Sequence, residues 1–438
     1  MKRILILGSI LLALGMWNDS HAGGFNIYEM GSRATSLGGA FTATADDPTA
    51  LFYNPAGIGW LNRGIAVSAN VSPIAPISKF TRASGATVGL YPGDVESQTA
   101  DRIYMPTGLY MSYRHNERWS GGVGFFTPFG LGVDWDDPET FPGRTLSTNS
   151  QIRSYYISPV ITFRPHSSIA FSAGVHFVVS TLKLEKILTQ SFGTDGTAYN
   201  VIKVDLEGTS GLSVAPAAAL MIRPSERFSF GVNFKGGVTN TFEDQDGDLK
   251  HLPTGIEPLD LSVAAQLNQL GRKQKVGGDL KYPAILSIGM RYMPADRLAL
   301  MADFVWFGWH TFDKVELEFS NPALNTILRE DYQDGQEWRF GAEYIISESF
   351  RFMGGLAYDN NPQPIGSVSP LLADANRWDY SLGLTYTMHK MEITAGYMLV
   401  TFEERSTVVN GEGFNYDGFD GVYKNIAHIP TLGLTYHF

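Results

Sequence analysis

A two-residue alternation of side-chain character constrains this chain more than any other feature of its sequence. Over segments of about ten residues, apolar side chains alternate with small or polar ones, as at 227–235, 337–346 and 378–388. Successive side chains of a β-strand point to opposite faces, so each segment predicts a strand with one apolar and one polar face. Because soluble two-sheet sandwiches and membrane-crossing barrels both contain such strands, the alternation alone leaves both open.

The connections between these segments fall into two length classes. Tight polar turns occur near residues 115–118, 165–167, 224–226, 294–296, 347–349 and 389–390. Long polar connections lie near residues 80–101, 134–150, 190–203, 241–279, 313–331, 360–375 and 404–424. Six short turns alternating with seven long loops require 14 strands, with both termini on the short-turn side. Outer-membrane barrels have short periplasmic turns and long extracellular loops. The sequence therefore predicts an all-β fold, a transmembrane antiparallel β-barrel.

Both ends of the chain agree with export to the bacterial outer membrane. Lys2 and Arg3 precede an apolar run that ends at Trp17, which is shorter than the roughly 20 residues of a membrane-spanning helix. We therefore expect residues 1–22 to be a secretory signal peptide. The final residue, Phe438, lies on the apolar parity of the last strand and resembles the signal read by the barrel assembly machinery.

Composition and motifs argue against several function classes. The net charge of −11 repels phosphate backbones, so we expect no nucleic-acid partner. The chain has no cysteine, no HExxH pair and no GxSxG sequence, so we expect no catalytic residue, metal or cofactor. His176 stands alone on the lumen parity of its strand, where a hydrogen-bonded filler is the expected role. A barrel protease or phospholipase remains the enzyme alternative.

Residues 23–63 do not alternate, and they precede the barrel predicted for residues 64–438. Fourteen strands enclose a lumen wider than side chains alone can fill. The segment is rich in Gly, Ala, Ser and Thr and contains a predicted short helix at 48–53, capped by Asp46 or Asp47. We expect it to plug the barrel. A disordered periplasmic leader is the alternative, and apolar residues such as Phe41 argue against it.

The plug segment carries a specific resemblance. Gly24 and Phe25, the run from Gly39 to Phe41, Ala45 to Asp47 and Asn54 to Gly57 resemble the amino-terminal hatch of the FadL/TodX family of outer-membrane transporters. Residues 127–131 (TPFGL) and the stretch 350–386 are also similar to that family. The resemblance implies a long-chain fatty acid or another hydrophobic small molecule as ligand, and a Phe25 side chain that reaches into the ligand pocket. We expect Asp46, Asp47, Asn54, Pro55 and Ala56 to form the hatch motif.

Pro128 lies inside the third alternating segment, from Trp119 to Trp135, and predicts a break in the wall. Proline cannot donate to a strand ladder and is expected only at edges or bulges. Continuous alternation would place Phe129 on the lipid side and Gly130 on the lumen side. The resemblance implies an inward kink at Pro128, Phe129 and Gly130 that opens a lateral gap. The alternative is that Pro128 marks the start of an extracellular loop.

Charged residues on lumen parity allow two interpretations. They are Arg114, Asp303, Glu337, Arg339, Glu343, Arg351, Asp379 and Glu392. We favour a paired network that holds the hatch, because buried charges need partners. A polar path or a carboxylate anchor for a fatty acid is the other interpretation.

A stripe at helical spacing in the longest loop comprises Leu259, Val263, Leu267 and Leu270. It predicts either the outward face of a substrate-collecting groove or a face packed against a neighbouring loop.

Burial energy favours a dry route for such a ligand. A tail of about 14 methylenes gains roughly 11 kcal/mol on burial, at about 0.8 kcal/mol per methylene. We therefore predict a monomeric carrier that captures a hydrophobic molecule at loop level and releases it sideways into outer-membrane lipid, by passive diffusion. A carrier of aromatic hydrocarbons with the same fold, and a structural or adhesive barrel, are the alternatives.

Overall fold

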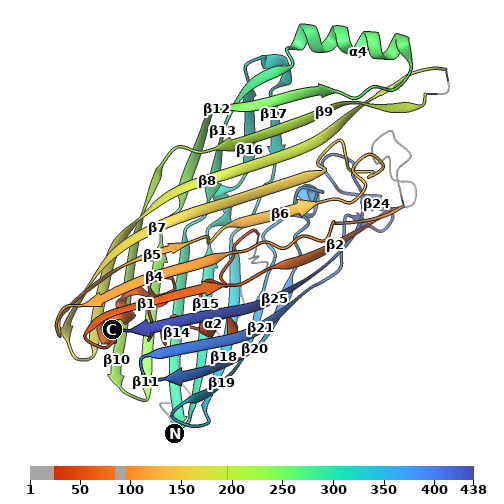
Figure 1. Ribbon diagram of the computed structural model, residues 1–438. Coiled ribbons are helices and arrows are strands. Elements are labelled where there is room, and N and C mark those ends of the chain that lie inside the picture. Colours follow the sequence, from red (N-terminus) through yellow and green to blue (C-terminus); the bar gives the residue numbers. More distant parts are fainter. Residues whose placement is uncertain (1–23, 84–94, 195) are drawn as a thin grey trace.

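The computed structural model describes residues 24–83, 95–194 and 196–438, which form a closed antiparallel β-barrel of 14 strands (Figure 1). The barrel closes where β1 (Gly64–Val71) pairs with β25 (Gly421–His437), with Val67 opposite Tyr436. The predicted fold class and number of strands are therefore confirmed. The predicted signal peptide, residues 1–22, and position 23 lie outside the described residues.

Several crossings of the wall consist of two consecutive elements separated by a kink or bulge. After β1 the wall comprises β2 (Ala75–Arg82), β3 (Glu96–Gln98), β4 (Thr107–Arg114), β5 (Trp119–Phe126), β6 (Gly130–Asp134), β7 (Asn149–His166), β8 (Ile169–Ser191), β9 (Ala198–Thr209), β10 (Ser213–Ser225), β11 (Phe228–Lys235), β12 (Val238–His251), β13 (Lys273–Tyr282), β14 (Ile285–Ala295), β15 (Leu298–Phe307), β16 (Lys314–Phe319), β17 (Thr326–Arg329), β18 (Gly335–Ile345), β19 (Phe350–Asp359), β20 (Arg377–Met388), β21 (Met391–Phe402) and β22 (Arg405–Ser406). A small hairpin, β23 (Val408–Val409) and β24 (Glu412–Gly413), lies in the last long loop.

The barrel wall is apolar outside and polar inside, the reverse of a soluble protein. In β20, Leu382 is 59% exposed, whereas its neighbours Ser381 and Asp379 are buried. Exposed apolar surface and buried polar groups are the informative departures from ordinary burial. The alternation in the sequence thus corresponds to a lipid-facing side and a lumen side.

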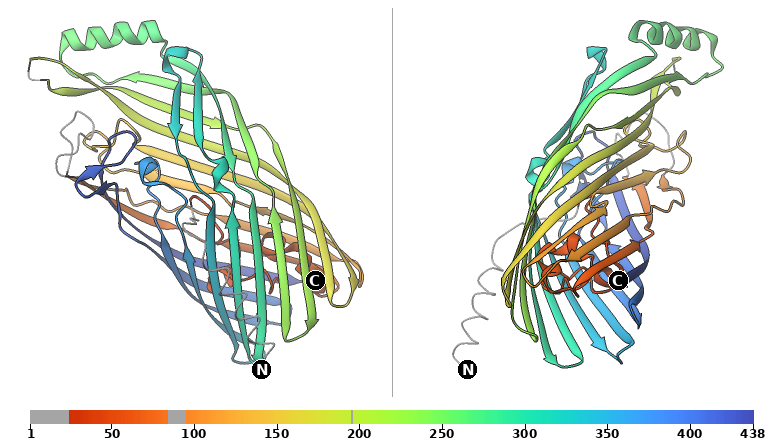
Figure 2. Two further views of the ribbon diagram at one scale, coloured as in Figure 1. Left: turned by 180° about the vertical axis from the view of Figure 1, so that it is seen from behind. Right: turned by 60° about the vertical axis from the view of Figure 1, so that its left-hand side comes forward.

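On one side of the barrel, the wall projects well beyond the rest at the long-loop end (Figure 2). There β12 and β13 extend into the segment 241–279, which the sequence predicts to be a loop. Exposed ion pairs such as Lys275 Nζ to Asp246 Oδ1, at 2.7 Å, allow these strands to be polar. Across the top lies α4 (Glu257–Leu270). Its side chains Leu259, Val263 and Leu267 pack against β9 and β12, as the packing alternative expects.

The segment before β1 lies inside the barrel. It contains α2 (Ser32–Ser36), α3 (Ala50–Tyr53) and the 3₁₀ turn η1 (Pro55–Trp60), and nearly all of its described residues are buried. The predicted helix at 48–53 is shorter in the structure and has Thr49 as N-cap. The Oδ1 atom of Asp47 instead accepts the Thr49 backbone N–H at 2.8 Å. Across the described residues, no helix has the length and apolar character needed to cross a membrane.

Candidate functional site

The third wall strand is broken by a bulge at residues 127–129. Phe126 pairs with Tyr156, but Gly130 pairs with Arg153, so three residues on one side oppose two on the other. One extra residue reverses the parity of everything that follows it. The prediction that Phe129 faces lipid is therefore wrong, because its side chain is 2% exposed and lies inside.

The same correction applies to the residues that follow Phe129. Val133 and Trp135, which continuous alternation also places on the lipid side, are buried. The prediction that Gly130 and Gly132 face the lumen is wrong as well, because the bulge also reverses their parity. A Cβ at Gly130 would lie 2.6 Å from Cδ1 of Ile27, and one at Gly132 would lie 2.0 Å from Cζ of Tyr104. Both glycines therefore make room for a neighbouring side chain.

Beside this bulge, two adjacent wall strands separate. The pairing of β4 with β5 ends at Leu109 and Phe125. It resumes near the loops, where the Ala100 N–H donates to the Asp134 carbonyl at 2.8 Å. Within the described chain, no backbone pairing joins residues 101–108 to residues 126–133; we call this stretch the wall gap.

Residues 24–27, which we call the hatch terminus, lie on the inner side of the wall gap. The Ile27 N–H donates to the Pro128 carbonyl at 2.8 Å, and the Gly130 N–H donates to the Phe25 carbonyl at 3.0 Å. Asn26 forms an antiparallel bridge with Phe129. Residues 25–27 thus take the hydrogen bonds that a wall strand would otherwise make.

A cavity passes along the wall gap. Its lining includes the lumen residue Asp374 and the strongly exposed residues Ile103 and Met105, so it reaches both sides of the wall. It contains about 1530 Å³ of atom-free space, part of it open to the surroundings. The Oδ2 atom of Asp374 accepts the Gly24 N–H at 2.7 Å, and burial raises the pKa of Asp374 to about 6.

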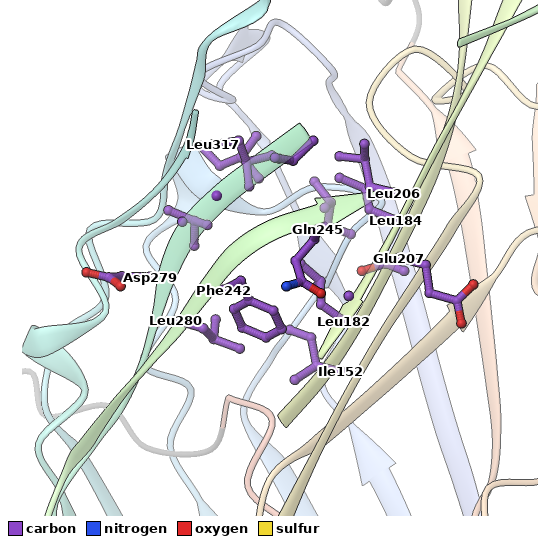
Figure 3. Close-up of a pocket in the computed structure, with 18 of the residues that line it drawn as sticks. Ile152, Leu182, Leu184, Leu206, Glu207, Phe242, Gln245, Asp279, Leu280 and Leu317 are labelled. Carbon is purple, nitrogen blue, oxygen red and sulfur yellow. The ribbon is translucent and has the colours of Figure 1, made fainter. Parts of the chain in front are cut away.

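A second cavity, the loop-level chamber, lies between the tall strands (Figure 3). Its apolar side chains come from β7, β8, β9, β12, β13 and β16. They include Ile152, Leu182, Leu184, Leu206, Phe242, Val276, Leu280 and Leu317. The chamber holds about 910 Å³ of atom-free space, part of it open to solvent.

Phe25 separates the two cavities. It lines both of them, together with Ile152 and Leu372. Its ring is 4% exposed and makes edge contacts with Trp309 and Phe312, at centroid distances of 4.8 and 5.3 Å. A ring in this place can close the passage from chamber to gap, or open it by moving.

The hatch motif residues hold the hatch rather than line either cavity. Asp46 accepts from Nη1 of Arg33 at 2.5 Å, and the same guanidinium donates through Nε to Glu343 of the wall at 2.8 Å. Asp47 lies 3.7 Å from Arg33 Nη1. The Asn54 side chain accepts the Ala56 N–H at 3.1 Å.

Wall residues anchor the hatch from outside. The Oδ2 atom of Asp303 accepts the N–H groups of Phe41 and Thr42, at 2.9 and 2.8 Å. The Pro55 carbonyl accepts the Thr162 hydroxyl at 2.9 Å. These bonds fit the interpretation of the lumen charges as a network that holds the hatch.

Three further wall charges are paired with each other or with hatch backbone. Arg339 pairs with Glu337 at 2.6 Å, and Arg114 donates to the Leu61 carbonyl at 2.7 Å. His176 hydrogen-bonds Ser158 at 2.6 Å, which fits its expected filler role.

Comparison with known proteins decides the family. Residues 16–438 match the family model for outer membrane protein transport proteins (OMPP1/FadL/TodX). The chain belongs to this family. Its members form outer-membrane β-barrels that transport hydrophobic compounds, and this chain is accordingly a transporter and not an enzyme.

Individual relatives are distant in sequence but similar over almost the whole length. A long-chain fatty acid transport protein of Escherichia coli O6:H1 is 20% identical, over 91% of this chain and 90% of its own. The crystal structure of a Pseudomonas aeruginosa FadL homologue superposes with a TM-score of 0.80 at 18% identity, over 94% of this chain and 99% of that one. The Pseudomonas putida toluene transporter TodX gives 0.71 at 15% identity, over 94% and 99%. These structures share the fold of this chain.

Several residues of the site could not be identified from the sequence. Asp374, Trp309, Phe312 and Tyr104 lie in connections without alternation, where no local pattern marks them. The sequence signal that could have indicated a close contact was the pair Gly130 and Gly132. Two glycines beside a proline indicate that something lies close to the backbone there.

Proposed function

We propose that the protein carries a hydrophobic small molecule from the loop-level chamber past Phe25 and out through the wall gap into the membrane. Passage is by passive diffusion and uses no cofactor. Long-chain fatty acids and aromatic hydrocarbons, the cargo classes named for the relatives, are the two candidates. The observation that carries the proposal is that Phe25 lines both cavities while residues 25–27 bond to the gap edge.

The energetics support sideways release. A molecule held by apolar side chains loses its burial energy if it is released into water, but keeps it if it moves directly into lipid. A closed ladder would bar that exit, whereas the gap lacks wall hydrogen bonds and is covered by side chains. Ile27 and Tyr104 lie over Gly130 and Gly132. Displacing these two side chains breaks no wall pairing.

A reversible lock on the hatch terminus tests the route. Asn26 and Phe129 are bridge partners. Partners of this kind are about 4.5–5.5 Å apart at Cα, which suits a disulfide. The chain has no cysteine of its own, so Asn26→Cys with Phe129→Cys gives a single defined bond. We expect the oxidised protein to bind ligand but not to deliver it, and reduction to restore uptake of a labelled hydrophobic molecule by cells.

The matched control places a disulfide elsewhere in the wall. Thr385 and Thr394 are paired on β20 and β21, with their hydroxyls 2.8 Å apart. Oxidised Thr385→Cys with Thr394→Cys should transport normally. Equal uptake by the oxidised and reduced forms of the gap variant would rule out release past residues 25–27.

A further inference from the structure

The loop-level chamber has an unusual distribution of charge for a site that would hold a fatty acid. Among the described residues, no Lys, Arg or His lines it. Its ionisable lining side chains are acidic, and three of the four are exposed on the far side of their strands: Glu207, Asp246 and Asp279. Figure 3 shows the Asp279 carboxylate pointing away from the cavity. These three residues contribute backbone rather than charge to the lining.

Glu330 is the fourth acidic residue and is largely buried at the chamber wall. Burial, together with nearby Asp417 and Asp331, raises the pKa of its carboxyl to about 8. At neutral pH this group is mostly protonated, and when it ionises it adds negative charge. The ionised group repels a ligand carboxylate, and the protonated group offers it a hydrogen bond but no positive charge.

Among the residues that the structure describes, the wall gap offers no free cation on its inner side either. Arg377 lines it, but this guanidinium pairs with Asp359 at 2.8 Å and lies 3.9 Å from Asp379. Arg153 also lines the gap and is exposed, donating to Gln151 at 3.2 Å. Glu29 and Asp374 are the remaining charged lining residues.

Arg405, whose charge acts on Tyr332 at the chamber wall, is also engaged. Arg405 donates through Nη2 to the Gln363 carbonyl at 2.6 Å, and it lines neither cavity. Among the described residues, a carboxylate would thus be desolvated in the chamber without a positive partner, and exposed Arg153, at the gap, would be the first available one. Burial of an unpaired charge is far more costly than burial of a neutral polar group.

From this charge distribution we propose that the transporter selects uncharged hydrophobic molecules, such as hydrocarbons and esters, and discriminates against fatty-acid carboxylates. The inference rests on the proposed function and names the substrate class of the same chamber. Apolar walls contribute equally to binding an acid and its ester. The difference in affinity therefore reports the missing counter-charge.

A matched pair of ligands tests this selectivity. Dodecanoate and methyl dodecanoate have the same tail, and displacement of a fluorescent apolar probe from purified protein at neutral pH measures both affinities. We expect the ester to bind at least about tenfold more tightly. Equal or tighter binding of dodecanoate would overturn the inference while leaving the transport route standing. If neither ligand nor toluene displaces the probe, the chamber binds neither candidate class of cargo and the proposed function itself fails.

Substitution at position 330 supplies an independent arm. Glu330→Lys places a cation at the chamber wall, where Asp331 and Asp417 stabilise its charged form. It should reduce the ester preference to about threefold or less. Glu330→Gln removes the acid without adding a cation and should retain most of the preference. A Lys variant with an unchanged ratio would show that charge at the chamber does not set selectivity.

Discussion

The lumen around the hatch and the loop-level chamber are both buried, yet they have opposite chemistry. In the lumen, ion pairs and backbone hydrogen bonds hold the hatch in place, and Arg33 links hatch carboxylates to Glu343 of the wall. The chamber is lined by aliphatic and aromatic side chains and lacks described cations. Directional bonds fix one position, whereas apolar contact tolerates many ligand poses. The polar region therefore holds a fixed part of the protein, and the apolar region can hold a mobile cargo.

Arg33 should show the largest effect. Arg33→Met leaves Glu343 and Asp47 buried without their cation, and breaking a buried pair in this way costs about 3–5 kcal/mol. We expect a strongly lowered unfolding midpoint in denaturant. Glu343→Gln with Arg33→Met, which removes both sides of the wall pair, should recover part of the loss. A single mutant as stable as wild type would show that the polar network does not anchor the hatch.

Phe25 lies at the boundary of the two regions, and its truncation should affect the chamber. Phe25→Ala removes a ring that contacts Trp309 and Phe312. Burial of such a ring contributes about 1.5–3 kcal/mol of transfer free energy. Ligand binding should weaken while barrel assembly, judged by heat-modifiable migration on gels, stays intact. Phe41→Ala is the matched control in the hatch, where ligand affinity should change less. Unchanged affinity in Phe25→Ala would assign Phe25 to plug packing alone.

Asp374 should give a smaller, pH-dependent effect at the hatch terminus. Burial raises its pKa from the ordinary 3.8 to about 6, so the folded state binds a proton more tightly than the unfolded state. Its contribution to stability is fully present below about pH 4 and is lost as pH rises through about 6. Relative to Asp374→Asn, the wild-type melting temperature should therefore fall between pH 4 and pH 7. A constant difference would show that Asp374 does not titrate in this range.

The smallest effect should come from α4 above the chamber. Val263 is fully buried against the cluster that includes Leu206 and Leu317, whereas Leu261 is 64% exposed. Val263→Ala should cost about 1 kcal/mol locally, and Leu261→Ala less than about 0.5 kcal/mol. Hydrogen exchange of the α4 amides measures both. Equal exchange rates in the two variants would show that the buried stripe does not stabilise α4.

The barrel could be predicted from sequence because its signal is local and repeated. The segment 378–388 alternates without interruption and forms β20 as predicted. Pro128 marked the place of the break, but the reversal of parity beyond it could not be predicted, because Phe125, Phe129 and Val133 keep the same spacing on both sides of the bulge. The chamber could not be assembled either, since Ile152, Leu206 and Leu317 meet only through register between distant strands. The sequence predicted that a paired charge network holds the hatch. It could not predict the partners, such as Arg33 with Glu343, because they depend on how the hatch folds.

The bulge at 127–129 exchanges the positions that face the lumen for those that face lipid in the rest of the strand. What matters at this point is how many residues the strand contains, and their identity is secondary. Deleting one of the three would leave two residues opposite Ser154 and Tyr155, so that β6 could continue the ladder of β5 while Gly130 still pairs with Arg153 and Val133 stays inside. An opening set by a residue count can persist while its rim side chains change, and diverging sequences can retain the passage while altering which molecules use it.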